Sequence, residues 1–183
     1  LFNEWYIGKH LNFNLSKKQS EELHQCYEQI YTIISKIPKS FMHRDFHSRN
    51  LMVTSEKNPG VLDYQDAVLG PITYDIVSLL KDCYVAWDEE TVYSMTSSFF
   101  SKIEKRHNVV YEEFEYWFDI TGLQRHLKAI GIFSRLNYRD NKSNYLGDIP
   151  RTLNYVTKML EKYSELSELK RIFSEINLDK TYD

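Results

Sequence analysis

Residues 43–50 read HRDFHSRN and residues 61–66 read VLDYQD, and the polar side chains of both segments adjoin short apolar runs. The apolar runs are Phe41–Met42, Leu51–Thr54 and Val61–Leu62. Apolar pieces of this length, separated by polar loops, are typical of short strands or hairpin arms. The sequence therefore predicts one small β-hairpin region that carries two clusters of polar residues at the ends of its strands.

The two polar clusters have the spacing of a phosphoryl-transfer site. In such sites an H-R-D-x-x-x-x-N loop supplies an aspartate and an asparagine, and a later aspartate at the end of a strand holds magnesium. The corresponding residues are Asp45, Asn50 and Asp63. Asp45 would orient the attacking hydroxyl and take its proton late. Asn50 and Asp63 would provide the hard oxygen ligands that Mg²⁺ prefers, and Mg²⁺ would neutralise the γ-phosphoryl group of ATP.

Other polar residues of the loop have less specific predictions. His43 and His47 are four positions apart, but no acidic or thiol ligand follows at the spacing of a zinc site. We expect His43 and Arg44 to brace the loop, although Arg49 is an alternative brace, and His47 is a candidate substrate contact. Asp75 lies near the start of a predicted helix and suits the positive end of its dipole.

Further candidate substrate contacts are polar residues that interrupt apolar segments. They are Asp66, Gln124, Arg125 and His126. A polyhydroxylated ligand needs such hydrogen-bonding partners, yet these residues are equally suited to cap or brace helices. The aromatic segment YEEFEYWF, residues 111–118, is predicted to lie in an amphipathic core, with stacking on a sugar as the alternative.

Most of the chain has helical periodicity. A helix is predicted from about Lys17 to Lys36, with Ser16 and Gln19 placed like a capping box and Pro38 after its end. From Ile72 the pattern is helical almost to the end, with final helices over 150–163 and 165–176 and a frayed polar end at 177–183. The predicted fold class is therefore α+β and mostly helical.

Composition excludes several classes of protein. The 183 residues include 27% charged and 42% hydrophobic residues, and the net charge is −3, which indicates an ordered globular chain without a basic surface for nucleic acid. Cys26 and Cys83 lack CxxC partners, so a reducing cytoplasm is expected. No apolar run is long enough to span a membrane, and the first residues do not resemble a signal peptide.

The segments HRDFHSRNLM and GVLDYQDAVLGPITYDIVSLLKDCY resemble the aminoglycoside-phosphotransferase-like kinases, whose loop reads H-x-D-x-H-x-x-N. With GLQRHLKAIGIFSRL and LFNEWYIGKHL, they are similar to the bacterial branch that phosphorylates N-acetylmuramate and N-acetylglucosamine at C1 in cell-wall recycling. The resemblance implies the C-terminal lobe of a protein-kinase-like fold and a sugar substrate, with ATP and Mg²⁺ as cofactors.

Such a kinase also needs an N-terminal lobe with a loop over the phosphates and a strand lysine. Neither is evident before Met42, so residues 1–183 are expected to be the C-terminal lobe, with 1–15 as a hinge or linker. The isolated lobe is expected to be inactive. The alternatives are a kinase for an aminoglycoside or a choline-like amino alcohol, and a non-catalytic binding module with the same fold. The sequence does not predict an oligomeric state.

Overall fold

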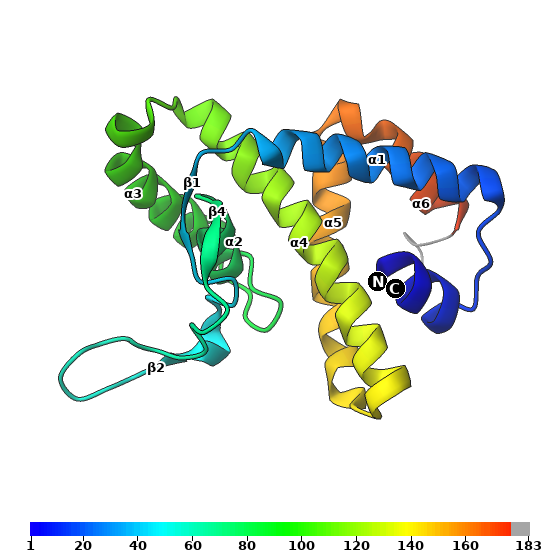
Figure 1. Ribbon diagram of the computed structural model, residues 1–183, viewed down its shortest axis with the longest axis horizontal. Helices are drawn as coiled ribbons and strands as arrows, with labels where there is room; N and C mark the ends of the chain where they lie inside the picture. The colour runs from blue at the N-terminus through cyan, green and yellow to red at the C-terminus, as the bar shows by residue number, and fades with distance from the viewer. Residues whose placement is uncertain (177–183) are drawn as a thin grey trace. The chain divides into compact units, whose positions relative to one another are not determined.

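The computed structural model describes residues 1–176 and divides the chain into two compact units (Figure 1). Among the described residues, unit 1 consists of 1–32 and 123–176, and unit 2 of Ile33–Gly122. Helices α1 (Lys17–Ser35) and α4 (Tyr111–Asp140) contribute residues to both units. Both units are rich in helix and only unit 2 has strands among the described residues, so the predicted mostly helical α+β class is confirmed.

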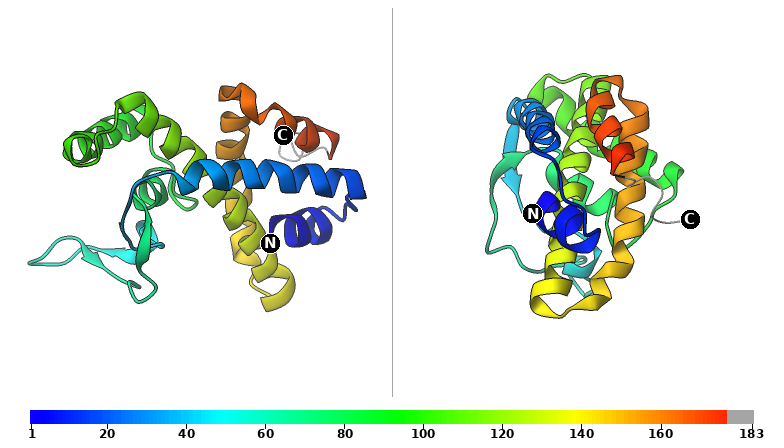
Figure 2. Two further views of the ribbon diagram at one scale, coloured as in Figure 1. Left: turned by 45° about the horizontal axis from the view of Figure 1, so that its top comes forward. Right: turned by 90° about the vertical axis from the view of Figure 1, so that its right-hand side faces the viewer.

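Unit 1 is helical. Besides its parts of α1 and α4, its elements are η1 (Phe2–His10), η3 (Ser143–Asp148), α5 (Ile149–Lys162), η4 (Ser164–Leu166) and α6 (Ser167–Glu175). Helix α5 runs beside the second half of α4, as Figures 1 and 2 show, and the rings of His126 and Tyr155 stack between the two helices at 4.8 Å. The final two helices were thus predicted to within two residues at each end, and Pro150 lies in the first turn of α5.

The capping box at the start of α1 is confirmed. The backbone N–H of Gln19 donates to Ser16 Oγ at 3.2 Å, and the N–H of Ser16 donates to Gln19 Oε1 at 3.0 Å. These bonds satisfy N–H groups that lack partners at the start of a helix. The helix ends at Ser35, just before Pro38, close to the predicted boundary.

The opening segment, which was predicted to be part of a hinge or linker, is helical. Residues 2–10 form a π-helical segment, η1, with Tyr6 and Ile7 fully buried. A Cβ on Gly131 of α4 would lie only 2.7 Å from the Phe2 nitrogen and 2.8 Å from the Leu1 carbonyl carbon. Glycine at this position therefore lets the start of η1 approach the backbone of α4 closely.

Unit 2 contains two small antiparallel sheets, one nested inside the other along the chain. The outer pair is β1 (Lys39–Met42) with β4 (Val68–Pro71), and the inner pair is β2 (Leu51–Met52) with β3 (Gly60–Val61). The outer register pairs Ser40 with Gly70, and the inner register pairs Leu51 with Val61. The sequence predicted a single hairpin region. It missed β4, because Val68–Pro71 contains glycine and proline and its pairing depends on a strand far away in sequence.

The nested pairing explains why the two polar clusters of the sequence meet. Residues 43–50 connect the outer strand β1 to the inner strand β2, and residues 62–67 connect β3 back to β4. Both connections therefore run between the same two sheets. Hydrogen bonds join them, because the Leu62 N–H donates to the Asn50 carbonyl at 3.0 Å and Arg44 Nη1 donates to the Asp66 carbonyl at 3.4 Å.

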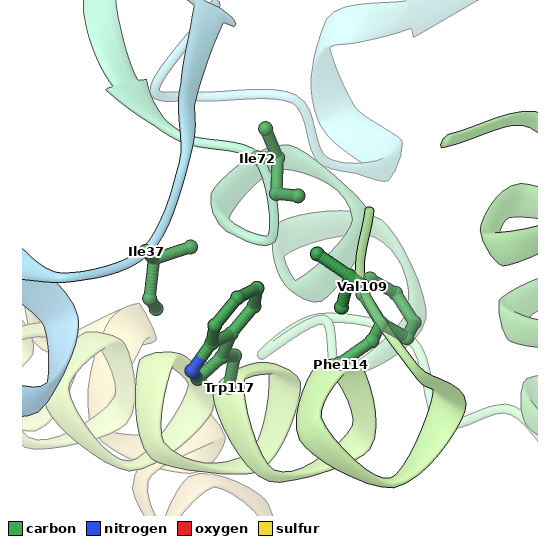
Figure 3. Close-up of a cluster of buried hydrophobic side chains, with 5 residues drawn as sticks. All are labelled: Ile37, Ile72, Val109, Phe114 and Trp117. Atoms are coloured by element: carbon green, nitrogen blue, oxygen red, sulfur yellow. The ribbon is translucent and has the colours of Figure 1, made fainter. Parts of the chain in front are cut away.

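Unit 2 also contains α2 (Tyr74–Leu80), α3 (Glu89–His107), the first part of α4 and the end of α1. Figure 3 shows the core cluster, in which Ile37 and Ile72 lie with Val109, Phe114 and Trp117 on or before α4. Phe118 packs with Val77 and Leu80 of α2 in a second cluster. The prediction that the aromatic segment 111–118 lies in a core is confirmed.

Among residues 1–176, none of the helices combines the length and the low polarity that a membrane span requires. The frayed polar end predicted at 177–183 lies outside the described residues.

Candidate active site

The first half of the loop is held by the carboxylate of Asp75 in the first turn of α2. The backbone N–H of His43 donates to Asp75 Oδ2 at 2.7 Å, and the N–H of Arg44 donates to Asp75 Oδ1 at 3.1 Å. Arg44 has a φ of 80°, in the left-handed region that non-glycine residues rarely adopt. Asp75 thus fixes a strained backbone immediately before Asp45, in addition to its predicted place near the start of a helix.

The second half of the loop is a turn of 3₁₀ helix, η2 (Ser48–Asn50), which carries Asn50. The His47 N–H donates to the Asp45 carbonyl at 3.0 Å, and Asn50 Nδ2 donates to the same carbonyl at 2.9 Å. This bond assigns the orientation of the Asn50 amide, because the opposite orientation would place two acceptor oxygens together. The Asn50 Oδ1 atom is therefore left to act as an acceptor or metal ligand.

The turn η2 is also held from the end of α2. Asp82, which is fully buried, accepts the N–H of Ser48 through Oδ2 and the N–H of Tyr84 through Oδ1, both at 2.8 Å. The Tyr84 ring lies 3.6 Å from the Arg49 guanidinium carbon and meets the His47 ring edge-on at 5.2 Å. The two ends of α2 thus hold the two halves of the loop, with Asp75 at one end and Asp82 beyond the other.

The three residues predicted to carry the chemistry lie on these connections. Asp45 is exposed and Asn50 is half-buried, while Asp63 is exposed and has a φ of 59° just after β3. The Leu62–Asn50 backbone bond ties the residue before Asp63 to the loop. The structure thus brings the two predicted segments together, with the two carboxylates accessible to solvent. Their assignments as base and metal ligands remain predictions.

The residues predicted to brace the loop take part in several contacts. His43 is buried, its ring packs edge-on against Phe46, and its two ring nitrogens have no hydrogen-bond partner among the described residues. The hydrogen bond from His43 to Asp75 is made by its backbone N–H. Arg44 reaches the carbonyl of Asp66, a candidate substrate contact whose side chain is exposed.

The remaining candidate substrate contacts belong to unit 1, whereas the loop belongs to unit 2. Arg125 is buried, and the imidazole of His126 is fully buried against Tyr155. Gln124 is half-buried and lines a cavity of about 410 Å³ within unit 1.

The same cavity is lined by Tyr27, whose hydroxyl donates to Asn3 Oδ1 at 2.6 Å. Burial raises the pKa of the Tyr27 phenol, which therefore stays protonated and remains a hydrogen-bond donor. The sugar contacts proposed for residues 124–126 stay predictions.

The residues present fit a magnesium ion. Mg²⁺ in phosphotransferases is bound by one or two protein side chains, with substrate phosphates and water completing its shell. Two donors of this kind are present. One is the amide oxygen of Asn50, whose Nδ2 atom bonds to the Asp45 carbonyl, and the other is the exposed carboxylate of Asp63. Within residues 1–176 no group of three or more His, Cys, Asp and Glu side chains gathers as a metal site.

Sequence reasoning missed Asp82 and Tyr84. Asp82 stands in LLKDCY, where the apolar neighbours predict burial, and a carboxylate in such a place signals a specific partner. That signal was available. The identity of the partner was not, because Ser48 lies 34 residues earlier in the chain.

The chain is similar in sequence to known proteins. The sequence profile described as the phosphotransferase enzyme family matches residues 3–104, which include the whole loop and both sheets. Over 179 residues the chain is 42% identical to the N-acetylmuramate/N-acetylglucosamine kinase of Neisseria meningitidis serogroup B, covering 96% of this chain and 53% of that protein. It is 40% identical to the kinase of the same name from Pseudomonas putida, with 96% and 52% covered.

The corresponding kinase of Pseudomonas aeruginosa is 38% identical, with 96% of this chain and 53% of that protein covered. The chain thus spans about half the length of the curated relatives it matches. The matched profile covers more than half of the chain, including Asp45, Asn50 and Asp63. The chain therefore belongs to the phosphotransferase enzyme family.

Proposed function

We propose that the protein containing this chain is an ATP- and Mg²⁺-dependent kinase of the anomeric C1 hydroxyl of N-acetylmuramate and N-acetylglucosamine. The observation that carries the proposal is that Asp45, Asn50 and Asp63 lie on two connections between the nested sheets, which the Leu62–Asn50 backbone hydrogen bond joins. The names of the relatives in Neisseria and Pseudomonas support the choice of sugar. The product would be a sugar 1-phosphate.

Asp45 is the proposed base. Its exposed carboxylate would accept a hydrogen bond from the C1 hydroxyl and align that oxygen with the γ-phosphorus of ATP. An anomeric hydroxyl is more acidic than an ordinary alcohol, so the carboxylate needs mainly to orient it. The bond between the C1 oxygen and phosphorus forms as the bond between the γ-phosphorus and the ADP oxygen breaks, and the hydroxyl proton passes to Asp45.

Asn50 and Asp63 are the proposed ligands of Mg²⁺, which when bound neutralises charge on the phosphates of ATP. Apolar side chains adjoin both of them: Met52 is 50% exposed, two residues after Asn50, and Leu62 is 47% exposed, immediately before Asp63. Exposed apolar side chains beside the metal ligands suit contact with the flat base of a nucleotide. This placement supports ATP as the phosphoryl donor.

We also propose that this chain is the C-terminal lobe of the kinase. The glycine-rich loop and the lysine that contact the phosphates in kinases would then come from the part of the protein that corresponds to the other half of the relatives. The isolated chain would then bind ATP weakly and would not phosphorylate the sugar.

A cationic substrate, such as an aminoglycoside or choline, is a less favoured acceptor. Such a substrate would be attracted by a cluster of carboxylates without basic neighbours. The loop instead carries Arg44 directly before Asp45 and Arg49 directly before Asn50. A non-catalytic binding module is also less favoured, because binding alone does not require Asp45, Asn50 and Asp63 together with carboxylates that hold both halves of the loop.

A phosphate-transfer assay on the full-length protein separates these readings. Purified protein is incubated with ATP and Mg²⁺ and with N-acetylmuramate, N-acetylglucosamine, an aminoglycoside or choline in parallel. The proposal predicts ADP release that depends on one of the two amino sugars and on Mg²⁺. Turnover with the aminoglycoside or choline alone would favour the other kinase reading, and no turnover with any acceptor would favour the binding module.

A further inference from the structure

We propose that Asp82 is a positioning residue for the metal ligand Asn50, a role that rests on the proposed kinase function. Asp82 lies just beyond the end of α2 and is fully buried. Each of its carboxylate oxygens accepts one backbone N–H at 2.8 Å, from Ser48 and from Tyr84. A buried carboxylate is costly to a fold unless it is well bonded, so its place beside the loop needs a reason.

Ser48 is the first residue of η2, the turn that ends at Asn50. The first N–H groups of a helical turn have no partner within the turn and need one from outside. His47 precedes the turn, but its side chain makes no capping hydrogen bond. Asp82 therefore caps the turn from a distant part of the chain, two residues before the side chain that is proposed to bind the metal.

Tyr84 strengthens the same attachment. Its ring contacts the residues on both sides of Ser48, the Arg49 guanidinium at 3.6 Å and the edge of His47 at 5.2 Å. Because Asp82 also accepts the Tyr84 N–H, one carboxylate fixes both the turn and the aromatic ring that packs on it. Three consecutive residues before Asn50 are thus held by the segment that follows α2.

The two ends of α2 divide the loop between them. Asp75 holds His43 and Arg44, which precede the proposed base Asp45, whereas Asp82 holds the turn that carries Asn50. Loss of the Asp82 carboxylate should therefore raise the Mg²⁺ concentration needed for nucleotide binding and for catalysis, and should change the KM for the sugar less. Residues that orient a metal ligand typically change metal affinity by about 10- to 100-fold when substituted.

The test uses the full-length protein with Asp82→Asn. Asparagine keeps one acceptor oxygen but turns its NH₂ group toward a backbone N–H, so one of the two bonds is lost with little change in volume. A second variant, Ser48→Pro, removes the N–H donor itself. His47 already has the extended conformation that a residue before proline requires, with φ −129° and ψ 171°, and proline suits the first position of a helical turn.

The matched control is Asp88→Asn. Asp88 also accepts a backbone N–H, that of Thr91 at 2.7 Å, but it does so as the exposed N-cap of α3, where asparagine is equally favourable. The readouts are the Mg²⁺ concentration that half-saturates ADP binding, measured by calorimetry without any sugar, and the same constant in the phosphate-transfer assay. Thermal unfolding shows whether each variant folds.

We expect Asp82→Asn and Ser48→Pro to raise the half-saturating Mg²⁺ concentration by about 10-fold or more, with a smaller change in the sugar KM and no change for Asp88→Asn. An unchanged half-saturating Mg²⁺ concentration in a folded Asp82→Asn protein would overturn the inference. An equal rise in the half-saturating Mg²⁺ concentration and in the sugar KM would also overturn it. If the wild type binds Mg²⁺ and ADP but phosphorylates neither sugar, the sugar assignment fails while the role of Asp82 is still decided. Absence of Mg²⁺-dependent ADP binding in the wild type would overturn both.

Discussion

Asp75→Asn perturbs the other half of the loop, and its effect follows from the backbone of Arg44. The positive φ of Arg44 costs about 1–2 kcal/mol for a residue with a Cβ. This conformation is held by the bonds from His43 and Arg44 to the two oxygens of Asp75. Asparagine retains only one acceptor oxygen, so one bond to a charged group, worth about 1.5–3 kcal/mol, is lost.

The lost bond is comparable in free energy to the strain that it balances, so the backbone before Asp45 should relax toward a negative φ. A displacement of about 1 Å in a positioned catalytic group reduces the rate by about 100-fold. We therefore expect kcat to fall by about 100-fold in the full-length protein. Unfolding should occur a few degrees lower, as about 2 kcal/mol implies for a protein of this size.

The assay compares Asp75→Asn, Arg44→Gly and the double variant in steady-state phosphate transfer. Glycine adopts a positive φ without the Cβ strain, so the loop no longer needs both bonds to hold its conformation. We expect the double variant to lose less activity than the two single variants predict by addition. Unchanged kcat in Asp75→Asn, or full additivity in the double variant, would show that Asp75 does not hold the backbone of Arg44 for catalysis.

Three further predictions concern stability, measured by thermal unfolding. Lys81→Met removes the ammonium partner, 2.5 Å away, of the buried Asp119 carboxylate, and should destabilise unit 2 by about 3–5 kcal/mol, with recovery when Asp119→Leu is added. If the double variant regained no stability, the loss in Lys81→Met would come from the ion pair itself and not from the unpaired carboxylate of Asp119. Gly131→Ala should lower the unfolding temperature, because its Cβ would lie 2.7 Å from the Phe2 nitrogen, and this overlap outweighs a gain in helix propensity of about 1 kcal/mol. A rise in the unfolding temperature would contradict the close packing of η1 on α4. Burial lowers the pKa of His10 in the folded protein below its ordinary 6.5, so the unfolded chain binds the proton more tightly. The free energy of unfolding should therefore fall as the pH drops below about 6.5, and it should fall less in His10→Gln than in the wild type. An equal loss in both proteins would exclude His10 as the cause.

Local patterns predicted the parts of the fold that depend on neighbouring residues. The capping box of Ser16 and Gln19 lies within a single turn, and Pro38 marks the end of α1 through its own covalent geometry. The spacing of Asp45, Asn50 and Asp63 could likewise be recognised, because the loop and the end of a strand are defined by short segments of sequence. These predictions needed no knowledge of which distant segments meet.

What the sequence did not reveal depends on pairing over long separations. Strand β4 is four residues long and contains Gly70, and it is recognisable only from its pairing with β1. A Cβ on Gly70 would require the end of the Met42 side chain of β1 to move, a contact that no local pattern contains. The contacts of Asp75 and Asp82 with the loop are of the same kind, because they join residues more than 30 positions apart.

The central claim is that Asp45 orients the anomeric hydroxyl of an amino sugar for attack on ATP. The most direct measurement is phosphorus NMR of the product formed by the full-length protein from ATP, Mg²⁺ and N-acetylmuramate, together with the turnover of Asp45→Asn. We expect a phosphate at C1 and a loss of about 10²- to 10⁴-fold in turnover when the carboxylate is removed. A phosphate at another hydroxyl, or unchanged turnover in Asp45→Asn, would contradict it.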